Sequence, residues 1–71
     1  MIPFVLPRGS QVTLKVFTHL GEEIATLVNQ KLPAGRHEAR WDASGWPSGV
    51  YFYRLRAGDR FVETRRLLLV K

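Results

Sequence analysis

Turn-forming residues recur along this chain at short, nearly regular intervals, and that spacing limits what the chain can fold into. Glycine, proline and aspartate divide the sequence into segments of about 5 to 10 residues, which is the rhythm of strands in a small sandwich or barrel. No segment between the breaks has the length and apolar spacing that predict a helix. Turns are expected at residues 7–10, 19–22, 33–35, 42–49 and 57–60.

Apolar and polar side chains alternate within most of these segments, as they do in a strand with one buried face. In residues 11–18 the apolar Val12, Leu14 and Val16 share one face, while threonine and lysine occupy the other. This segment is therefore predicted to be a half-buried strand. Strands are predicted at residues 2–6, 11–18, 23–28, 35–41, 50–56 and 61–70.

One of these segments fits two patterns. The spacing of Ile24, Leu27 and Val28 would suit one or two turns of helix as well as a strand. Gly21 lies just before it and ends the preceding strand, and so tight a connection favours a hairpin. We therefore predict a strand at residues 23–28 that pairs with residues 11–18.

With no helix to cover a sheet, the predicted strands must cover one another. Gly58 and Asp59 are expected to join the last two strands as a hairpin. Pro3 and Pro7 favour an edge position for the first strand, because proline cannot donate a ladder hydrogen bond. The sequence therefore predicts an all-β fold of two small sheets packed face to face, in a single domain over residues 1–71.

The composition limits the chemistry. The chain has 71 residues, of which 45% are hydrophobic, so it is predicted to collapse around one small core. It has no cysteine, and no apolar run approaches the roughly 20 residues of a membrane-spanning helix. Its two histidines are expected to be a solvated turn residue, His19, and a residue at the rim of the core, His37. We predict no metal site and no cofactor.

Positive charge is the strongest compositional bias, with a formal net charge of +5. A basic domain attracts anionic partners, which include nucleic acid, acidic lipid headgroups and acidic polysaccharide. The alternative is that the arginines form the solvated outer face of two strands. The arginines concerned are Arg54, Arg56, Arg60, Arg65 and Arg66.

No pattern of catalytic residues is recognisable. Ser10, a histidine and either Asp42 or Asp59 contain the groups of a hydrolytic triad, but nothing in the sequence brings them together, and no nucleophile elbow is present. Asp42 is instead expected to accept backbone N–H bonds and fix its turn. The adjacent Glu22 and Glu23 point apart and do not suit paired-carboxylate catalysis. The chain is predicted not to be an enzyme.

The aromatic side chains have two interpretations. Trp41 and Tyr51 fall on predicted inward faces and are expected to pack in the core. Trp46 lies in a loop beside Pro47 and is the candidate for an exposed ring that stacks on a sugar, or for a plug at the end of the sandwich. Rings alternate with arginine at residues 53–56, as in some nucleic-acid-binding proteins, but core packing is the favoured interpretation there.

The order of the motifs resembles that of a bacterial family, the C-terminal sorting domain of proteins exported by type IX secretion. The Ig-like domain of flagellar hook-capping proteins shares much of the pattern. The resemblance spans essentially the whole chain. The motifs are Val12-Thr13-Leu14-Lys15-Val16-Phe17, residues 20–28, Pro33-Ala34-Gly35-Arg36-His37, Trp41-Asp42, Ser48-Gly49-Val50-Tyr51-Phe52-Tyr53-Arg54-Leu55 and Arg65-Arg66-Leu67-Leu68-Leu69-Val70-Lys71.

The resemblance implies a small Ig-like β-sandwich of about six to seven antiparallel strands. It also implies a non-catalytic domain that forms the C-terminal part of a larger exported protein and directs it to the cell surface or the medium. The implied partners are the outer-membrane secretion machinery, a sortase-like peptidase and an upstream cargo domain in the same chain. Anionic surface polysaccharide is a further candidate partner, and nucleic acid is not expected.

We expect the export machinery to recognise one edge of the sandwich, because an apolar final strand with basic residues before it suits strand addition or groove docking. Two alternatives stay open: a structural or assembly module as in hook-capping proteins, and a carbohydrate-binding or cell-attachment module that uses Trp46. The predicted recognition edge consists of Gly49, Val50, Tyr51, Arg65, Arg66, Leu67, Leu69 and Lys71.

Overall fold

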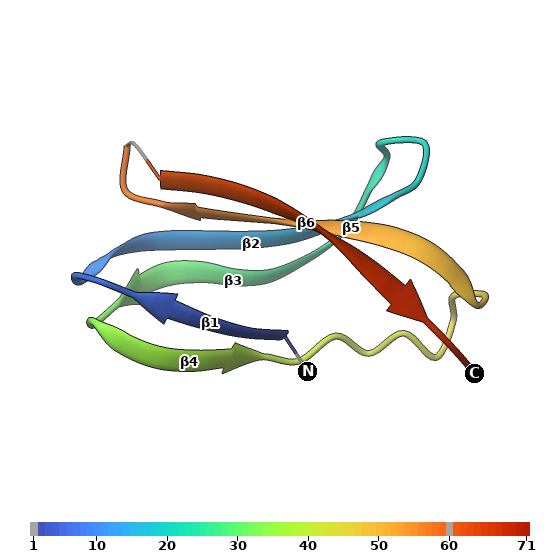
Figure 1. The fold of residues 1–71 in the computed structure, drawn as a ribbon, viewed down its shortest axis with the longest axis horizontal. Helices are drawn as coiled ribbons and strands as arrows, with labels where there is room; N and C mark the ends of the chain where they lie inside the picture. The colour runs from blue at the N-terminus through green and yellow to red at the C-terminus, as the bar shows by residue number, and fades with distance from the viewer. Residues whose placement is uncertain (1, 60) are drawn as a thin grey trace.

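The computed structural model describes residues 2–59 and 61–71, which form six strands in two antiparallel sheets (Figure 1). The all-β prediction is confirmed. Arg60, one of the arginines named above, lies outside the described residues. The strands are β1 (Ile2–Leu6), β2 (Ser10–Thr18), β3 (Glu23–Leu32), β4 (Gly35–Ala39), β5 (Gly49–Ala57) and β6 (Phe61–Leu69).

The two sheets differ in size and lie one above the other (Figure 1). The larger sheet has the order β3-β2-β5-β6, and the smaller sheet consists of β1 and β4 alone. Within the described residues β1 pairs only with β4, which gives it the edge position that Pro3 and Pro7 predicted. The pairing of β2 with β5 joins two hairpins, β2–β3 and β5–β6, into one layer.

The core lies between the two sheets, on the faces that alternation predicted. Val12, Leu14 and Val16 of β2 are completely buried, and Leu55 of β5 lies beside Leu14 in the sheet register. The smaller sheet covers them with every second residue of β1. The buried core residues of β1 and β4 are Ile2, Phe4, Leu6 and Ala39.

Two irregularities in the pairing of β2 with β3 explain the ambiguous spacing noted in the sequence. The register shifts between Leu14 and Lys15 and again between Val16 and Phe17, so that β3 carries an extra residue at each point. Such bulges change which face the following side chains occupy. Both Leu27 and Val28, although adjacent in sequence, consequently pack against the core.

The hairpin turns use local hydrogen bonds and glycine. In the β2–β3 turn the main-chain N–H groups of Leu20 and Glu22 donate to the hydroxyl of Thr18. In the β5–β6 turn Gly58 has φ +64°, a left-handed conformation that glycine adopts without a steric penalty. The N–H of Gly58 donates to the carbonyl of Gln11 at 2.9 Å, which ties this turn to the start of β2.

The end of the final strand is apolar, but the strand is not buried on both faces. Leu67 packs against the core, whereas Leu68 is 66% exposed. The core therefore covers only the face of β6 that carries Leu67.

Candidate recognition surface

The predicted recognition edge is formed by two neighbouring strands, β5 and β6. Residues 49–51 begin β5, and residues 65–69 end β6, so antiparallel pairing brings the two segments side by side. β6 is the outermost strand, and among residues 2–59 and 61–71 no strand pairs with its other side. In the register, Gly49 lies opposite Leu69, Val50 opposite Leu68, Tyr51 opposite Leu67, Phe52 opposite Arg66, and Tyr53 opposite Arg65.

Alternation along β6 divides the members of this edge between two faces. Leu67 and Leu69 are half-buried on the inner side, whereas Leu68 and Val70 are 66% and 76% exposed. The predicted recognition edge includes Leu67 and Leu69 but not the more exposed Leu68 and Val70. Leu68 lies directly opposite Val50, and the register of β5 and β6 places both side chains on the outer face of the larger sheet.

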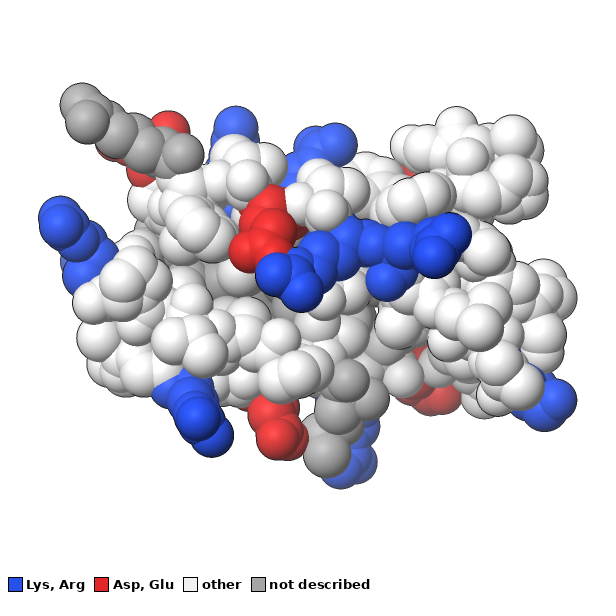
Figure 2. Space-filling view, viewed as in Figure 1, with Lys and Arg blue, Asp and Glu red and all other residues white. Residues whose placement is uncertain are grey.

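The two arginines of the edge also point to different faces. Arg66 lies opposite Phe52 on the outer face, and Arg65 lies opposite Tyr53 on the inner side. The guanidinium of Arg65 forms an ion pair with Glu63, two residues earlier on the same strand face. Figure 2 shows basic side chains beside one acidic group where β6 crosses the front of the molecule.

The loop before β5 is packed against this edge through aromatic side chains. Tyr51 is buried, its hydroxyl donates to the carbonyl of Pro47 at 2.6 Å, and its ring meets Trp41 edge to face with centroids 5.2 Å apart. The prediction of inward packing is confirmed for Tyr51, whereas Trp41 is half-buried and packs against Tyr51. Their contacts fix residues 41–47 against the start of β5.

Lys71 closes the same end of the sandwich. Its main-chain N–H donates to the hydroxyl of Ser48 at 3.0 Å, and its ammonium donates to the carbonyl of Ser44 at 2.9 Å. The ammonium also lies close enough to Asp42 to favour its charged form. Two hydrogen bonds therefore connect the last residue to a loop more than twenty positions earlier in the sequence.

Asp42 fixes the turn, as predicted. Its carboxylate accepts the N–H of Ser44 at 3.1 Å. This bond is the main reason that the pKa of Asp42 lies below its ordinary value of 3.8, and a bond with the Ser44 hydroxyl and the charge of Lys71 act in the same direction. Slight desolvation opposes them.

Trp46 is half-buried and lines a groove of about 650 Å³ beside the edge. The groove lies between the β2–β3 turn and the start of β5, and its other apolar members include Leu20 and Val50. Leu20 is 83% exposed and belongs to the β2–β3 turn, whose residue Glu22 also lines the groove. The role of Trp46 in binding stays a prediction.

The residues considered for catalysis lie in separate parts of the fold. His19 is exposed in the β2–β3 turn, and Ser10 begins β2, where its hydroxyl donates to the carbonyl of Arg8. Asp42 and Asp59 lie in two different loops. Within residues 2–59 and 61–71 no three metal-binding side chains gather, and no helix is long and apolar enough to cross a membrane.

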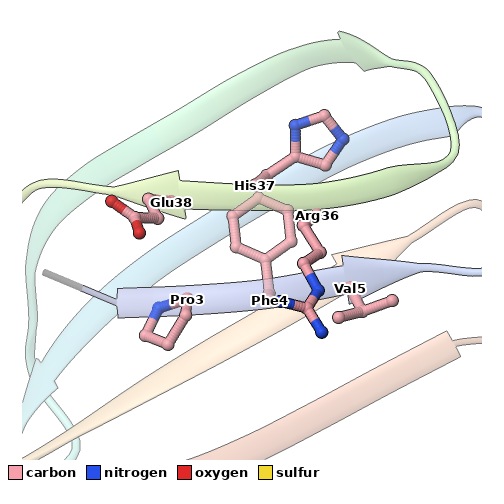
Figure 3. A pocket seen from close by; sticks show the side chains of 6 residues that line it. All are labelled: Pro3, Phe4, Val5, Arg36, His37 and Glu38. Carbon is pink, nitrogen blue, oxygen red and sulfur yellow. The ribbon is translucent and has the colours of Figure 1, made fainter.

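His37 lies at the rim of the core, as expected. It is half-buried, its ring stacks on Phe4 with centroids 5.4 Å apart, and its Nε2–H donates to the carbonyl of Pro33 at 2.8 Å. Figure 3 shows this pair on neighbouring strands beside a hollow of about 550 Å³. The ring nitrogen that points to the carbonyl is already used in a structural hydrogen bond.

Comparison of the sequence with known protein families assigns the chain to one of them. A family model described as "Secretion system C-terminal sorting domain" matches residues 2–71. No curated protein and no solved structure matches the chain. Domains of this family are sorting signals for type IX secretion rather than a class of enzymes. Such a domain interacts with the secretion machinery and is attached to an upstream cargo domain. It marks that cargo for export to the cell surface or the medium. Because the match covers nearly every residue, this chain belongs to the secretion system C-terminal sorting domain family.

Proposed function

We propose that the export machinery reads this sorting signal through the recognition edge, by pairing with the open side of β6. An edge strand presents a row of main-chain N–H and C=O groups that another chain can pair with. β6 occupies that position in the larger sheet, and the only strand it pairs with in the described part of the chain is β5. This edge position is the observation that carries the proposal.

Side chains around the edge give the pairing its specificity. Leu68 and Val70 project from the end of β6, and Val50 lies opposite Leu68. Burial of exposed aliphatic side chains by a partner contributes free energy in proportion to the apolar area removed from water. Arg65 and Arg66 add charge on either side of the strand.

The hydrogen bonds of Lys71 hold the edge ready for docking. A free strand end would have to lose conformational entropy when a partner binds, and that loss would weaken binding. The bonds from Lys71 to Ser48 and Ser44 already restrict this end. The folded domain thus presents an extended segment without a further ordering cost.

The domain works as a fragment of a larger exported protein, and a sortase-like peptidase removes it after export. Any enzymatic activity of that larger protein belongs to the upstream cargo rather than to residues 1–71. The separate locations of Ser10, His19 and Asp42 support this assignment.

A transplant tests the proposal. Residues 1–71 are joined to the C-terminus of a periplasm-directed fluorescent protein in a bacterium with type IX machinery, and in a mutant that lacks it. We expect fluorescence outside the outer membrane only in the competent strain. The double variant Leu68→Ser/Val70→Ser should reduce export severalfold, because it removes exposed apolar area without opening the core.

The matched control is Phe61→Ser/Val62→Ser, at the other end of the same strand. These side chains are also apolar and partly exposed, so the control removes exposed apolar area from a part of β6 outside the recognition edge. Equal losses of export in the two double variants would contradict the proposed edge. A folded reporter that stays in the periplasm of both strains would favour a structural Ig-like module instead.

A further inference from the structure

The outer face of the larger sheet, turned away from β1 and β4, carries most of the basic excess of the chain. Pairing places the side chains of Lys15 and Arg54 next to each other, and those of Thr13 and Arg56. We call this outer face, with its cations, the basic face. Its cations are Lys15, Lys31, Arg54, Arg56 and Arg66, and its one carboxylate is that of Glu23.

The charge on this face is largely uncompensated. Five cations against one carboxylate give it a net charge of +4, compared with the formal +5 of the whole chain. Glu23 forms an ion pair with Lys15 at 3.1 Å. Among the described residues no carboxylate lies within 4 Å of the other four cations. The basic face therefore presents free positive charge to an anionic partner.

Arg54 and Arg56 are arranged to hold an anion. The guanidinium of Arg54 lies over the ring of Phe17, 4.9 Å from its centroid, which restricts the side chain. A guanidinium stacked in this way keeps its N–H edge free for bidentate bonds to phosphate. Arg54, Arg56, Lys15 and Thr13 line a hollow of about 140 Å³.

Exposed aliphatic side chains adjoin one end of the basic face. Val50 and Leu68 form the next cross-strand pair after Phe52 and Arg66, on the same side of the sheet. Leu20, in the turn beside Val50, is 83% exposed and lines the same groove. A row of cations that ends in protruding aliphatic side chains is the pattern of a protein surface that rests on lipid headgroups.

We propose that the basic face binds a membrane surface rich in anionic, phosphate-bearing lipids, with Arg54 and Arg56 on the phosphates and Leu20 inserted between headgroups. An acidic polysaccharide would supply anions for the cations of the basic face, but it has no apolar region that would bury the exposed aliphatic side chains. The rings on this face, Phe17 and Phe52, are half-buried, and Phe17 is covered by Arg54, so neither offers a platform for a sugar. This binding goes beyond sorting, because it would hold the domain at a bilayer.

Co-sedimentation of residues 1–71 with vesicles tests the inference. The vesicles contain phosphatidylglycerol and phosphatidylcholine, or phosphatidylcholine alone. We expect binding to the anionic vesicles only, weakening as ionic strength rises from about 0.01 M to about 0.15 M. Arg54→Gln/Arg56→Gln should weaken binding roughly tenfold to thirtyfold, at about one kcal/mol per basic residue near the membrane. Leu20→Ser should weaken it severalfold and keep the dependence on salt.

The matched control is Arg36→Gln/Arg40→Gln, which removes the same charge from exposed positions in and next to β4, on the other sheet. It should change binding less than threefold. Equal losses in the two arginine variants would overturn the basic face as the site. Tighter binding to polygalacturonate or to DNA than to the anionic vesicles would overturn the lipid assignment. None of the substituted residues belongs to the recognition edge, so failure of this test and failure of the export test are distinguishable.

Discussion

The main-chain N–H of Lys71 donates a hydrogen bond to the hydroxyl of Ser48, 3.0 Å away. Ser48 immediately precedes β5, and Lys71 lies two residues beyond the end of β6. This contact extends the association of the two strands past their last paired residues, Gly49 and Leu69. It therefore protects the end of the recognition edge from fraying.

Ser48→Ala should release that end. We expect the free energy of unfolding to fall by about 0.5 to 1 kcal/mol, because the bond is exposed and its donor regains water when it breaks. Amide hydrogen exchange at residues 67–71 should accelerate more than exchange in β2. Ser48→Thr keeps the hydroxyl and should restore protection. Unchanged exchange at residues 67–71 in Ser48→Ala would show that the bond does not hold the strand end.

Asp42 should make stability depend on acid pH. Its pKa is lowered in the folded chain, chiefly by the N–H of Ser44, so its contribution to stability is present above the ordinary pKa of 3.8, which applies to the unfolded chain, and is lost as pH falls through the folded pKa. Urea unfolding below pH 4 should therefore show a shallower decline for Asp42→Asn than for the unaltered chain. If the free energy of unfolding fell equally in the two proteins below pH 4, the lowered pKa of Asp42 would be contradicted. A carboxyl-carbon NMR titration measures the shift directly.

Leu14→Ala should be the more damaging of two leucine substitutions. Leu14 is 0% exposed between the sheets, and a cavity there should cost about 2 to 5 kcal/mol, a large fraction of the stability of so small a domain. Leu68→Ala is the matched control, since Leu68 is 66% exposed, and it should change stability by about 0.5 kcal/mol or less. Chemical denaturation of both variants checks the difference. If the two variants unfolded at similar denaturant concentrations, the core would not be centred on β2.

Gly58→Ala should destabilise the β5–β6 turn through backbone conformation alone. Nothing lies within 4 Å of the added methyl group, but φ is +64°, so a cost of about 1 kcal/mol is expected. Gly45→Ala meets the same open space without a positive φ and should be neutral or slightly stabilising. Thermal unfolding of the pair isolates the conformational effect. A larger loss in Gly45→Ala would refute this account.

The alternation of apolar residues and the turn residues predicted the strands well, because strand and turn formation depend on residues that are close together in sequence. The first strand was predicted with its observed bounds, Ile2–Leu6, and the buried face of β2 was predicted from Val12, Leu14 and Val16. The β5–β6 hairpin followed from Gly58 and Asp59. Each of these features depends on residues close together in sequence.

Features set by strand pairing were harder to predict. The extent of β3, Glu23–Leu32, was underestimated because the part that follows Val28 begins with three polar residues, 29–31, which pair with β2 although they carry no apolar pattern. The exposure of Leu68 depends on the strand that lies beside β6 and on the face that the register gives to Leu68, and the sequence of residues 61–70 contains neither. The contact of Lys71 with Ser48 likewise joins positions whose proximity only the register of β5 and β6 determines.

The pairing of β2 with β5 also determines when the domain can form. Between these two strands lie the whole of β3, β4 and the loop that follows β4, so the central ladder closes a long loop before its contacts stabilise the chain. Topologies dominated by such distant pairings fold in roughly milliseconds to seconds, more slowly than helical domains of equal size. During synthesis β2 and β3 emerge before β5, and they cannot form the central pairing until β5 has emerged. The larger sheet of the sorting domain consequently cannot be complete until β5 has been synthesised.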